Sequence, residues 1–357
     1  MVKVAASGAG AADGRVEFEI DVVGARYNIW YQAQGNCRLA ASGDLELAMT
    51  LPVAMAVDGA LELDLPVSDG LLVQQNAIQD TLLTWYPELR RAALDTVTDQ
   101  IVVPPDVGPG TLACFTGGVD SFYSVLSHPG QLSGLLFVHG FDVPLGALAL
   151  RRTVSQHLGE VATEIGVELI EVETNLRELL DPYVDWGRIA HGPAIVAVAS
   201  ALRRDYGRLL IPSSHGDRDL FAWGSHPVLD PLWSTPALRV EHDGGQLTRV
   251  QKIQSMASSP LIARHLRVCW QPGAEYNCGS CEKCLRTMMT LDMVGALAAS
   301  ETFPREVDLD VVAMLPVRNE NDAAYLRENL ELAREVGSLA QIAALEAAQR
   351  RYLAREQ

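Results

Sequence analysis

The chain has 357 residues, of which 28 are Lys or Arg and 45 are Asp or Glu, so its formal net charge is −17. This acidity disfavours an extended nucleic-acid surface, because a phosphate backbone is bound by clustered basic side chains. No apolar run reaches membrane-spanning length, and the start lacks the pattern of a signal peptide. We therefore expect a cytoplasmic protein that contacts neither membrane nor extended nucleic acid.

Residues 1–105 are expected to form an N-terminal β-rich domain. Apolar and polar residues alternate over 16–22, which predicts a half-buried strand. Further alternating runs occur at 27–32, 45–51 and 61–65. Apolar residues at helical spacing predict a helix over 69–85. We interpret this region as a small antiparallel β domain with one helix, joined to the rest by a linker at Pro104 and Pro105.

Residues 106–298 show a different pattern, in which apolar strands alternate with helices. The expected strands are 112–115, 134–139, 167–172 and 208–212. The expected helices are 120–126, 145–165 and 192–206. Continuous apolar strands alternating with helices predict an α/β fold with a parallel, doubly wound sheet covered on both faces. Ligands of such sheets bind beyond the carboxyl ends of the strands.

Residues 299–357 are expected to form a C-terminal helical segment. A helix is predicted over 322–336, and a second begins at Ser338, which is followed three residues later by Gln341 in a capping-box arrangement. Both helices carry an apolar stripe. They can pack on the preceding domain or on a second copy of the chain, so a homodimer is one expectation.

Residues 116–121, Thr-Gly-Gly-Val-Asp-Ser, lie between the first apolar strand and an amphipathic helix. Two glycines let the backbone approach a ligand, and the free N–H groups of the helix start attract an anion. Asp120 adds a carboxylate that can orient the loop or a Mg²⁺ ion, and Ser121 adds a hydroxyl. No lysine follows the glycines, so a Walker-type loop is excluded. The pattern predicts a phosphate-binding loop made by Thr116, Gly117, Gly118, Asp120 and Ser121.

Four of the six cysteines, Cys269, Cys278, Cys281 and Cys284, fall within sixteen residues in the spacing C-x8-C-x2-C-x2-C. Four thiolates at this spacing are typical of a closed structural Zn²⁺ site. A [4Fe–4S] cluster is the main alternative, because C-x2-C-x2-C also occurs in ferredoxins.

These two features resemble one known family. The 116–121 sequence is similar to the S-G-G-x-D-S loop of the ATP pyrophosphatase (PP-loop, adenine nucleotide alpha hydrolase-like) superfamily, with Thr116 in place of the first serine. The stretch Cys269-Trp270 followed by residues 278–286, Cys-Gly-Ser-Cys-Glu-Lys-Cys-Leu-Arg, resembles the zinc knuckle of 7-cyano-7-deazaguanine synthases. The resemblance covers about residues 110–290. It implies a Rossmann-like ATP-binding domain in which a substrate is adenylated and pyrophosphate leaves.

The resemblance also implies roles for individual residues. Lys252 lies in a segment similar to the family's lysine-bearing helix, where it would neutralise charge that develops on the α-phosphate. His191 and Gly192 correspond to a helix start that contributes to nucleotide binding. The end of the second strand lines the adenine pocket in the superfamily, which implies roles for His139 and Asp142.

The expected substrate loop departs from the family. The synthases carry Gly-Tyr-Pro-Asp-Cys-Arg, whereas residues 224–233 here read Gly-Ser-His-Pro-Val-Leu-Asp-Pro-Leu-Trp. Pro227 and Asp230 match, but the cysteine and arginine are missing. We keep Asp230 as a catalytic candidate and expect His226 and Ser214 to contact substrate. Arg188 is a further substrate candidate, because its guanidinium can bind a carboxylate through two parallel hydrogen bonds.

The expected function is that of an ATP-dependent, AMP- and pyrophosphate-forming ligase. ATP and Mg²⁺ would activate a carboxylate or carbonyl oxygen of a small molecule, and ammonia or an amine would then displace AMP to give an amide or a nitrile. Positioning and charge stabilisation suffice for such chemistry. Two alternatives remain open, namely a PP-loop sulfur transferase and a nucleotide-binding module without turnover.

Overall fold

The computed structural model describes residues 1–6, 14–35, 37–57, 59–96, 107–271, 273–318 and 320–353. Their strands form one ten-stranded sheet in the order β10-β9-β6-β7-β8-β3-β2-β1-β4-β5. Six of the nine neighbouring pairs are parallel. The protein is therefore α/β with a mostly parallel sheet. Among these residues, none of the helices is both long and apolar enough to cross a membrane.

The parallel half of the sheet determines where a ligand can bind. It contains β6 (Gly110–Cys114), β7 (Gly134–His139), β8 (Glu168–Thr174), β9 (Tyr206–Pro212) and β10 (Arg239–Asp243). The chain starts in the middle at β6, continues to β7 and β8 on one side, and returns to β9 and β10 on the other. Strand order thus reverses between β6 and β9. In open α/β sheets, the crevice at such a reversal is the usual ligand site.

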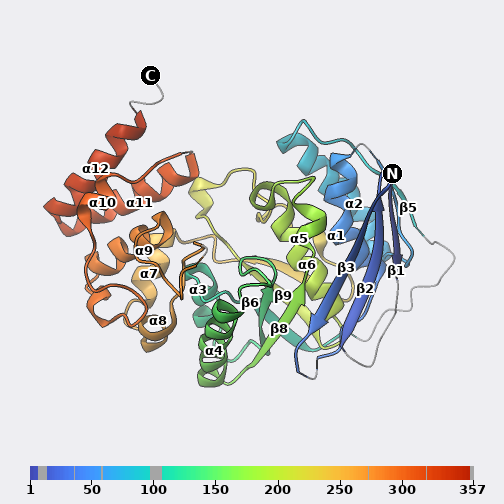
Figure 1. Ribbon diagram of the computed structural model, residues 1–357, viewed down its shortest axis with the longest axis horizontal. Coiled ribbons are helices and arrows are strands. Elements are labelled where there is room, and N and C mark those ends of the chain that lie inside the picture. Colours follow the sequence, from blue (N-terminus) through green and yellow to red (C-terminus); the bar gives the residue numbers. More distant parts are fainter. Residues whose placement is uncertain are drawn as a thin grey trace.

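Helices cover both faces of this sheet (Figure 1). The connections from β6 to β7 and from β7 to β8 are α3 (Val119–Ser127) and α4 (Leu148–Ile165), which share one hydrophobic core. The connection from β8 to β9 contains the short α5 (Arg177–Leu180), a π-helical turn (Trp186–Ala190) and α6 (His191–Ala201). The apolar residues of α6 belong to a second core on the opposite face. The doubly wound arrangement expected for the central region is present.

The N-terminal strands extend the same sheet. They are β1 (Val2–Ala6), β2 (Arg15–Val22), β3 (Ala25–Ala33), β4 (Ala60–Glu62) and β5 (Ala93–Asp95). Strand β3 pairs antiparallel with β8, with Tyr31 opposite Thr174, so the expected boundary near residue 105 does not separate two sheets. The expected linker at Pro104 and Pro105 lies outside the described residues.

One expected strand is wrong. Residues 45–51 lie inside α1 (Gly43–Ala56), and α2 (Asp69–Trp85) is the helix that the sequence predicts. Thirteen of the fourteen α1 residues are buried, so the helix is buried on every side. In a helix without an exposed face, the apolar residues do not recur with a 3.6-residue period. A short stretch of such a helix can then show the alternating pattern of a strand.

The C-terminal third is helical and packs beside the parallel half of the sheet (Figure 1). It contains α7 (Arg249–Met256), α8 (Pro260–His265), α9 (Glu282–Met293), α10 (Leu309–Ala313), α11 (Glu320–Val336) and α12 (Leu339–Leu353). The α9, α11 and α12 helices share a small hydrophobic core that includes Leu285, Met289, Leu330 and Leu345. Contacts between α11 and both α7 and α9 bring the C-terminal segment against the central domain.

Gly192, an expected nucleotide-binding residue, has a packing role at the start of α6. A Cβ at this position would lie 2.0 Å from the carbonyl oxygen of Gly224. We therefore expect Gly192→Ala to lower the free energy of unfolding by about 1–3 kcal/mol, because the backbone must move apart. Gly159→Ala is the matched control in α4, where the nearest atom would be 4.0 Å away. Urea unfolding should show no loss for the control, and equal stabilities would contradict this account.

Candidate functional site

The 116–121 loop follows β6 at the point where the strand order reverses. Gly117 has a φ of +73°, which favours glycine, and its carbonyl oxygen accepts a hydrogen bond of 2.8 Å from the Arg267 amide. Gly118 is the N-cap of α3, and the Ser121 hydroxyl donates to the Gly118 carbonyl at 3.0 Å. The loop is thus held by its own backbone and by the chain around Arg267. The N-terminus of α3 begins directly after the glycines, as an anion cradle requires.

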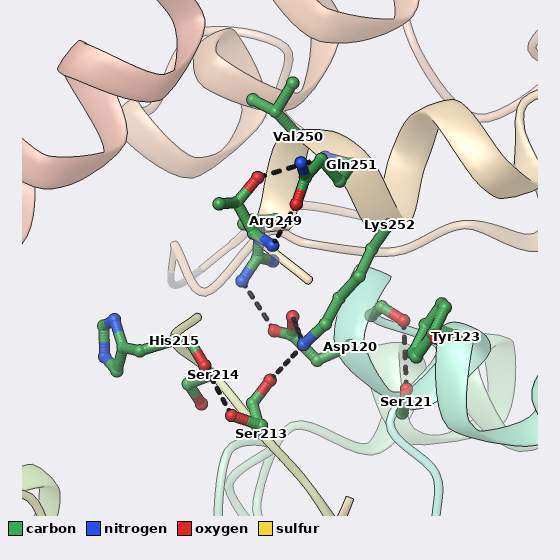
Figure 2. A network of polar contacts seen from close by, with 12 residues as sticks. Asp120, Ser121, Tyr123, Ser213, Ser214, His215, Arg249, Val250, Gln251 and Lys252 are labelled. Carbon is green, nitrogen blue, oxygen red and sulfur yellow. Dashed lines mark hydrogen bonds and ion pairs between the residues drawn. The ribbon is translucent and has the colours of Figure 1, made fainter. Parts of the chain in front are cut away.

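Asp120 lies between two cations of α7 (Figure 2). Arg249 contacts one carboxylate oxygen at 2.7 Å, and Lys252 contacts the other at 3.2 Å. The Lys252 side chain is 1% exposed, and its ammonium also donates to the Ser213 carbonyl at 2.5 Å. Burial acts to raise the pKa of Asp120, but Arg249 and Lys252 outweigh it, so the pKa is lowered. The structure thus brings together two residues that the sequence singled out, Asp120 and Lys252.

Two further cations near the loop have no counter-charge in contact. Within the described residues, neither the Arg267 nor the Lys283 side chain makes a hydrogen bond or an ion pair, and the buried Arg267 Nε atom is unpartnered. Burial lowers the pKa of both groups, and the only carboxylate that markedly opposes this for Arg267 is the exposed Asp142. Removing a cation from water is costly unless an anion is close. Arg267 and Lys283 therefore favour a bound anion.

Helix α11 of the C-terminal segment also contacts this site. The Tyr325 hydroxyl donates to the Ser214 carbonyl at 3.1 Å, and the Arg286 guanidinium lies 3.7 Å from the centre of the Tyr325 ring. His215 packs against the same ring, and burial lowers its pKa to about 3, so it is neutral near pH 7. Ser214, a predicted substrate residue, is therefore positioned by its backbone, and its carbonyl oxygen already has a partner.

Asp230 organises a second polar cluster on the β10 side. The Asp230 carboxylate is 1% exposed, and it accepts hydrogen bonds from Ser225 at 2.7 Å, from the His226 amide at 3.2 Å and from His242 Nδ1 at 2.7 Å. The His242 Nε2 atom is buried without a partner. Ser213, His215, Ser225, His226 and His242 line one small pocket together with Leu220, Phe221 and Trp223. This pocket adjoins the Lys252 contact through Ser213.

Three predicted binding residues make contacts within the protein. Both His139 ring nitrogens are engaged, by Glu171 at 2.8 Å and by Arg151 at 3.2 Å. Arg188 is on the surface, where it pairs with Glu88 at 3.2 Å. Gly192 allows close packing, as described above.

The other two predicted nucleotide-binding residues are Asp142 and His191. Asp142 is exposed, and its charge acts on Arg267, Lys283 and His191. His191 at the start of α6 bonds through Nδ1 to the Trp186 carbonyl at 3.1 Å, and Asp230 and Asp142 both act on it electrostatically. His191 is therefore close to both the Asp230 cluster and Asp142.

The four cysteines converge as expected. Cys269 and Cys281 sulfurs are 4.0 Å apart, and those of Cys278 and Cys284 are 3.8 Å apart. Thiolates at the Zn–S distance of about 2.3 Å occupy tetrahedron corners about 3.8 Å apart. Cys278 Sγ also accepts a hydrogen bond from the Cys281 amide at 3.2 Å, which supports a ligand thiolate. The cluster fits a metal ion such as zinc.

Several residues of this site were missed in the sequence. They are Arg249, Arg267, Lys283, Arg286, Tyr325 and His242. The sequence contained a signal for Arg249 and for Lys283. Arg249 precedes Lys252 by three residues, on the same helix face, and Lys283 lies between two predicted metal ligands. His242 and Tyr325 carry no local pattern, since only the tertiary fold brings them to the crevice.

No protein-family model matches the chain, and neither a curated protein nor a solved structure matches it. Function must therefore be inferred from the geometry of the described residues.

The four-cysteine cluster generates a direct test. Cys284→Ser should remove one metal ion per chain and lower Tm by about 10 °C, because binding energy at a structural site contributes to folding. Cys37→Ser is the control, since Cys37 lies far from the cluster in sequence and outside the metal group. Elemental analysis measures the metal, and absorbance near 400 nm would reveal an iron–sulfur cluster instead of zinc. Unchanged metal content in Cys284→Ser would contradict the assignment.

Proposed function

We propose that this protein is an ATP-dependent adenylating enzyme of the PP-loop type, similar to 7-cyano-7-deazaguanine synthases, that forms a carbon–nitrogen bond. One observation carries the proposal. Five cations, Arg249, Lys252, Arg267, Lys283 and Arg286, gather around a glycine-containing loop at the strand-order reversal of a chain whose net charge is −17. Such a concentration of positive charge, part of it uncompensated, fits a polyphosphate.

The chain's own residues divide the work of nucleotide binding. Backbone amides of Gly117 and Gly118 and the α3 N-terminus would hold the β- and γ-phosphates, and Lys252 would stabilise charge on the α-phosphate and on departing pyrophosphate. Asp120 is the carboxylate beside the loop that could hold Mg²⁺. Because Arg249 and Lys252 already engage its two oxygens, we expect metal binding to displace one of these cations toward the phosphates.

The Asp230 cluster suits the second half of the reaction. In the first half, a substrate carboxylate oxygen attacks the α-phosphorus and pyrophosphate leaves. In the second, ammonia or an amine attacks the acyl carbon, AMP leaves, and the nitrogen must lose a proton. His242 is held by Asp230 through Nδ1 and presents a free Nε2, which can accept that proton. Asp230 is then a positioning residue, and His242 is the proton acceptor.

Sulfur transfer has less support. A sulfur carrier needs an accessible cysteine whose thiol ionises easily. Burial raises the pKa of the Cys37 thiol to about 11, and burial also raises the pKa of Cys114 in β6. Among the described residues, neither thiol has a cation in contact that would activate it, so we favour carbon–nitrogen bond formation.

Asp120→Asn tests the adenylation half. We expect substrate-dependent exchange of labelled pyrophosphate into ATP to fall at least about 100-fold, because the loop loses its metal-holding carboxylate and the counter-charge that positions Lys252. A set of carboxylic acids, including 7-carboxy-7-deazaguanine, would serve as substrates. Glu164→Gln, on the surface beside Arg264, is the matched control and should retain full exchange. Wild-type exchange in Asp120→Asn would overturn the site assignment.

His242→Asn separates the two halves of the reaction. Asn can keep the hydrogen bond to Asp230 but lacks the outer ring nitrogen. We expect pyrophosphate exchange within about twofold of wild type, whereas amide formation falls about 100-fold or more. Quenched-flow analysis of adenylate and amide would distinguish the steps. An equal loss of both would show that His242 acts on folding or on substrate binding.

A further inference from the structure

A second group of metal-ligating side chains lies between α4 and α8. It contains His157 and Glu160 of α4 and His265 at the end of α8, and its ligand atoms all lie within 4.8 Å of one another. The Nδ1 atoms of His157 and His265 are 3.0 Å apart. His265 Nδ1 is also 3.8 Å from a Glu160 carboxylate oxygen. None of these residues takes part in the proposed reaction.

The three side chains can bind a cation between them. A carboxylate is only an acceptor, and each neutral imidazole has one nitrogen with a free electron pair. With both facing Nδ1 atoms unprotonated, three electron-pair donors meet across a short distance, an arrangement that a bound cation stabilises. Zinc binds imidazole nitrogen and carboxylate oxygen at about 2.0–2.1 Å, so tetrahedral ligands are about 3.3 Å apart. The observed separations of 3.0 and 3.8 Å lie on either side of that value.

The surroundings hold the two imidazoles in place. The Tyr276 ring stacks on His157 with centroids 4.2 Å apart, and the Tyr276 hydroxyl donates to the His265 carbonyl at 2.7 Å. His157 and Glu160 are three residues apart, which places them on one face of α4. His265 is 2% exposed, whereas the Glu160 side chain is 50% exposed. One half-buried imidazole, one buried imidazole and one exposed carboxylate supply three ligand atoms, which leaves the fourth position of a tetrahedral ion to water.

We propose that His157, Glu160 and His265 bind a divalent ion of the zinc type, in a site separate from the four cysteines and with one open coordination position. The ion would tie α4 to α8. It would also fix the segment that supports the phosphate-binding loop, since the His265 carbonyl lies 3.7 Å from the position of a Cβ on Gly117 and the Arg267 amide bonds to Gly117. The rival explanation is a hydrogen bond between two neutral imidazoles without metal.

Co²⁺ titration of the zinc-containing full chain tests the site. With the cysteines occupied by zinc, we expect one equivalent of Co²⁺ to bind and to give weak visible bands without thiolate charge transfer. His157→Gln and Glu160→Gln should each weaken this binding at least about tenfold. His128→Gln is the matched control, because His128 bonds to the Ser124 carbonyl outside the cluster.

A stability measurement accompanies the titration. Added Zn²⁺ should raise Tm of the wild type and of His128→Gln but not of the two ligand variants, since an ion that binds the folded state stabilises it. Glu160→Gln changes a half-exposed side chain, so it keeps the test valid if His157→Gln folds poorly. Absence of a cobalt signal in the wild type, charge-transfer bands from cysteine, or undiminished binding in both variants would each overturn the proposal.

Discussion

The ion pairs from Arg249 and Lys252 to Asp120 are the interaction on which the rest of the site depends. All three groups are largely buried, and a buried charge is tolerated only beside a partner. The contact joins the 116–121 loop after β6 to helix α7, and the bond from Lys252 to the Ser213 carbonyl adds the end of β9. Three segments that meet at the reversal of strand order are thereby held in one arrangement.

Positive charge is more concentrated at this crevice than its carboxylates can neutralise. Asp120 balances part of the α7 charge and Glu282 pairs with Arg286, but Arg267 and Lys283 have no partner in contact within the described chain. Arg267 precedes Cys269 and Lys283 precedes Cys284, so both cations belong to the four-cysteine segment. The fold of this segment keeps them close together. A structural metal there would order both cations beside the loop. Metal binding and nucleotide binding are thus expected to be coupled through the backbone.

The C-terminal helices contribute to the same crevice. Tyr325 of α11 contacts Ser214 and Arg286, and a Glu328 carboxylate oxygen accepts from the Val250 amide in the first turn of α7. The expectation of an appended helical segment is confirmed, but its contribution to the site was not anticipated. The N-terminal strands similarly extend the central sheet through β3 and β8, so that both ends of the chain support the middle.

The sequence by itself determined the parallel strands, the 116–121 loop and the four cysteines, because strand hydrophobicity, paired glycines and close cysteine spacing are local patterns. It failed at α1, whose burial on all sides removes the helical period. Only the tertiary structure decided that Asp120 meets Arg249, that Asp230 holds His242 and that His157 meets His265. Those contacts join residues far apart along the chain, and charge pairing across such distances leaves no periodic trace in a sequence.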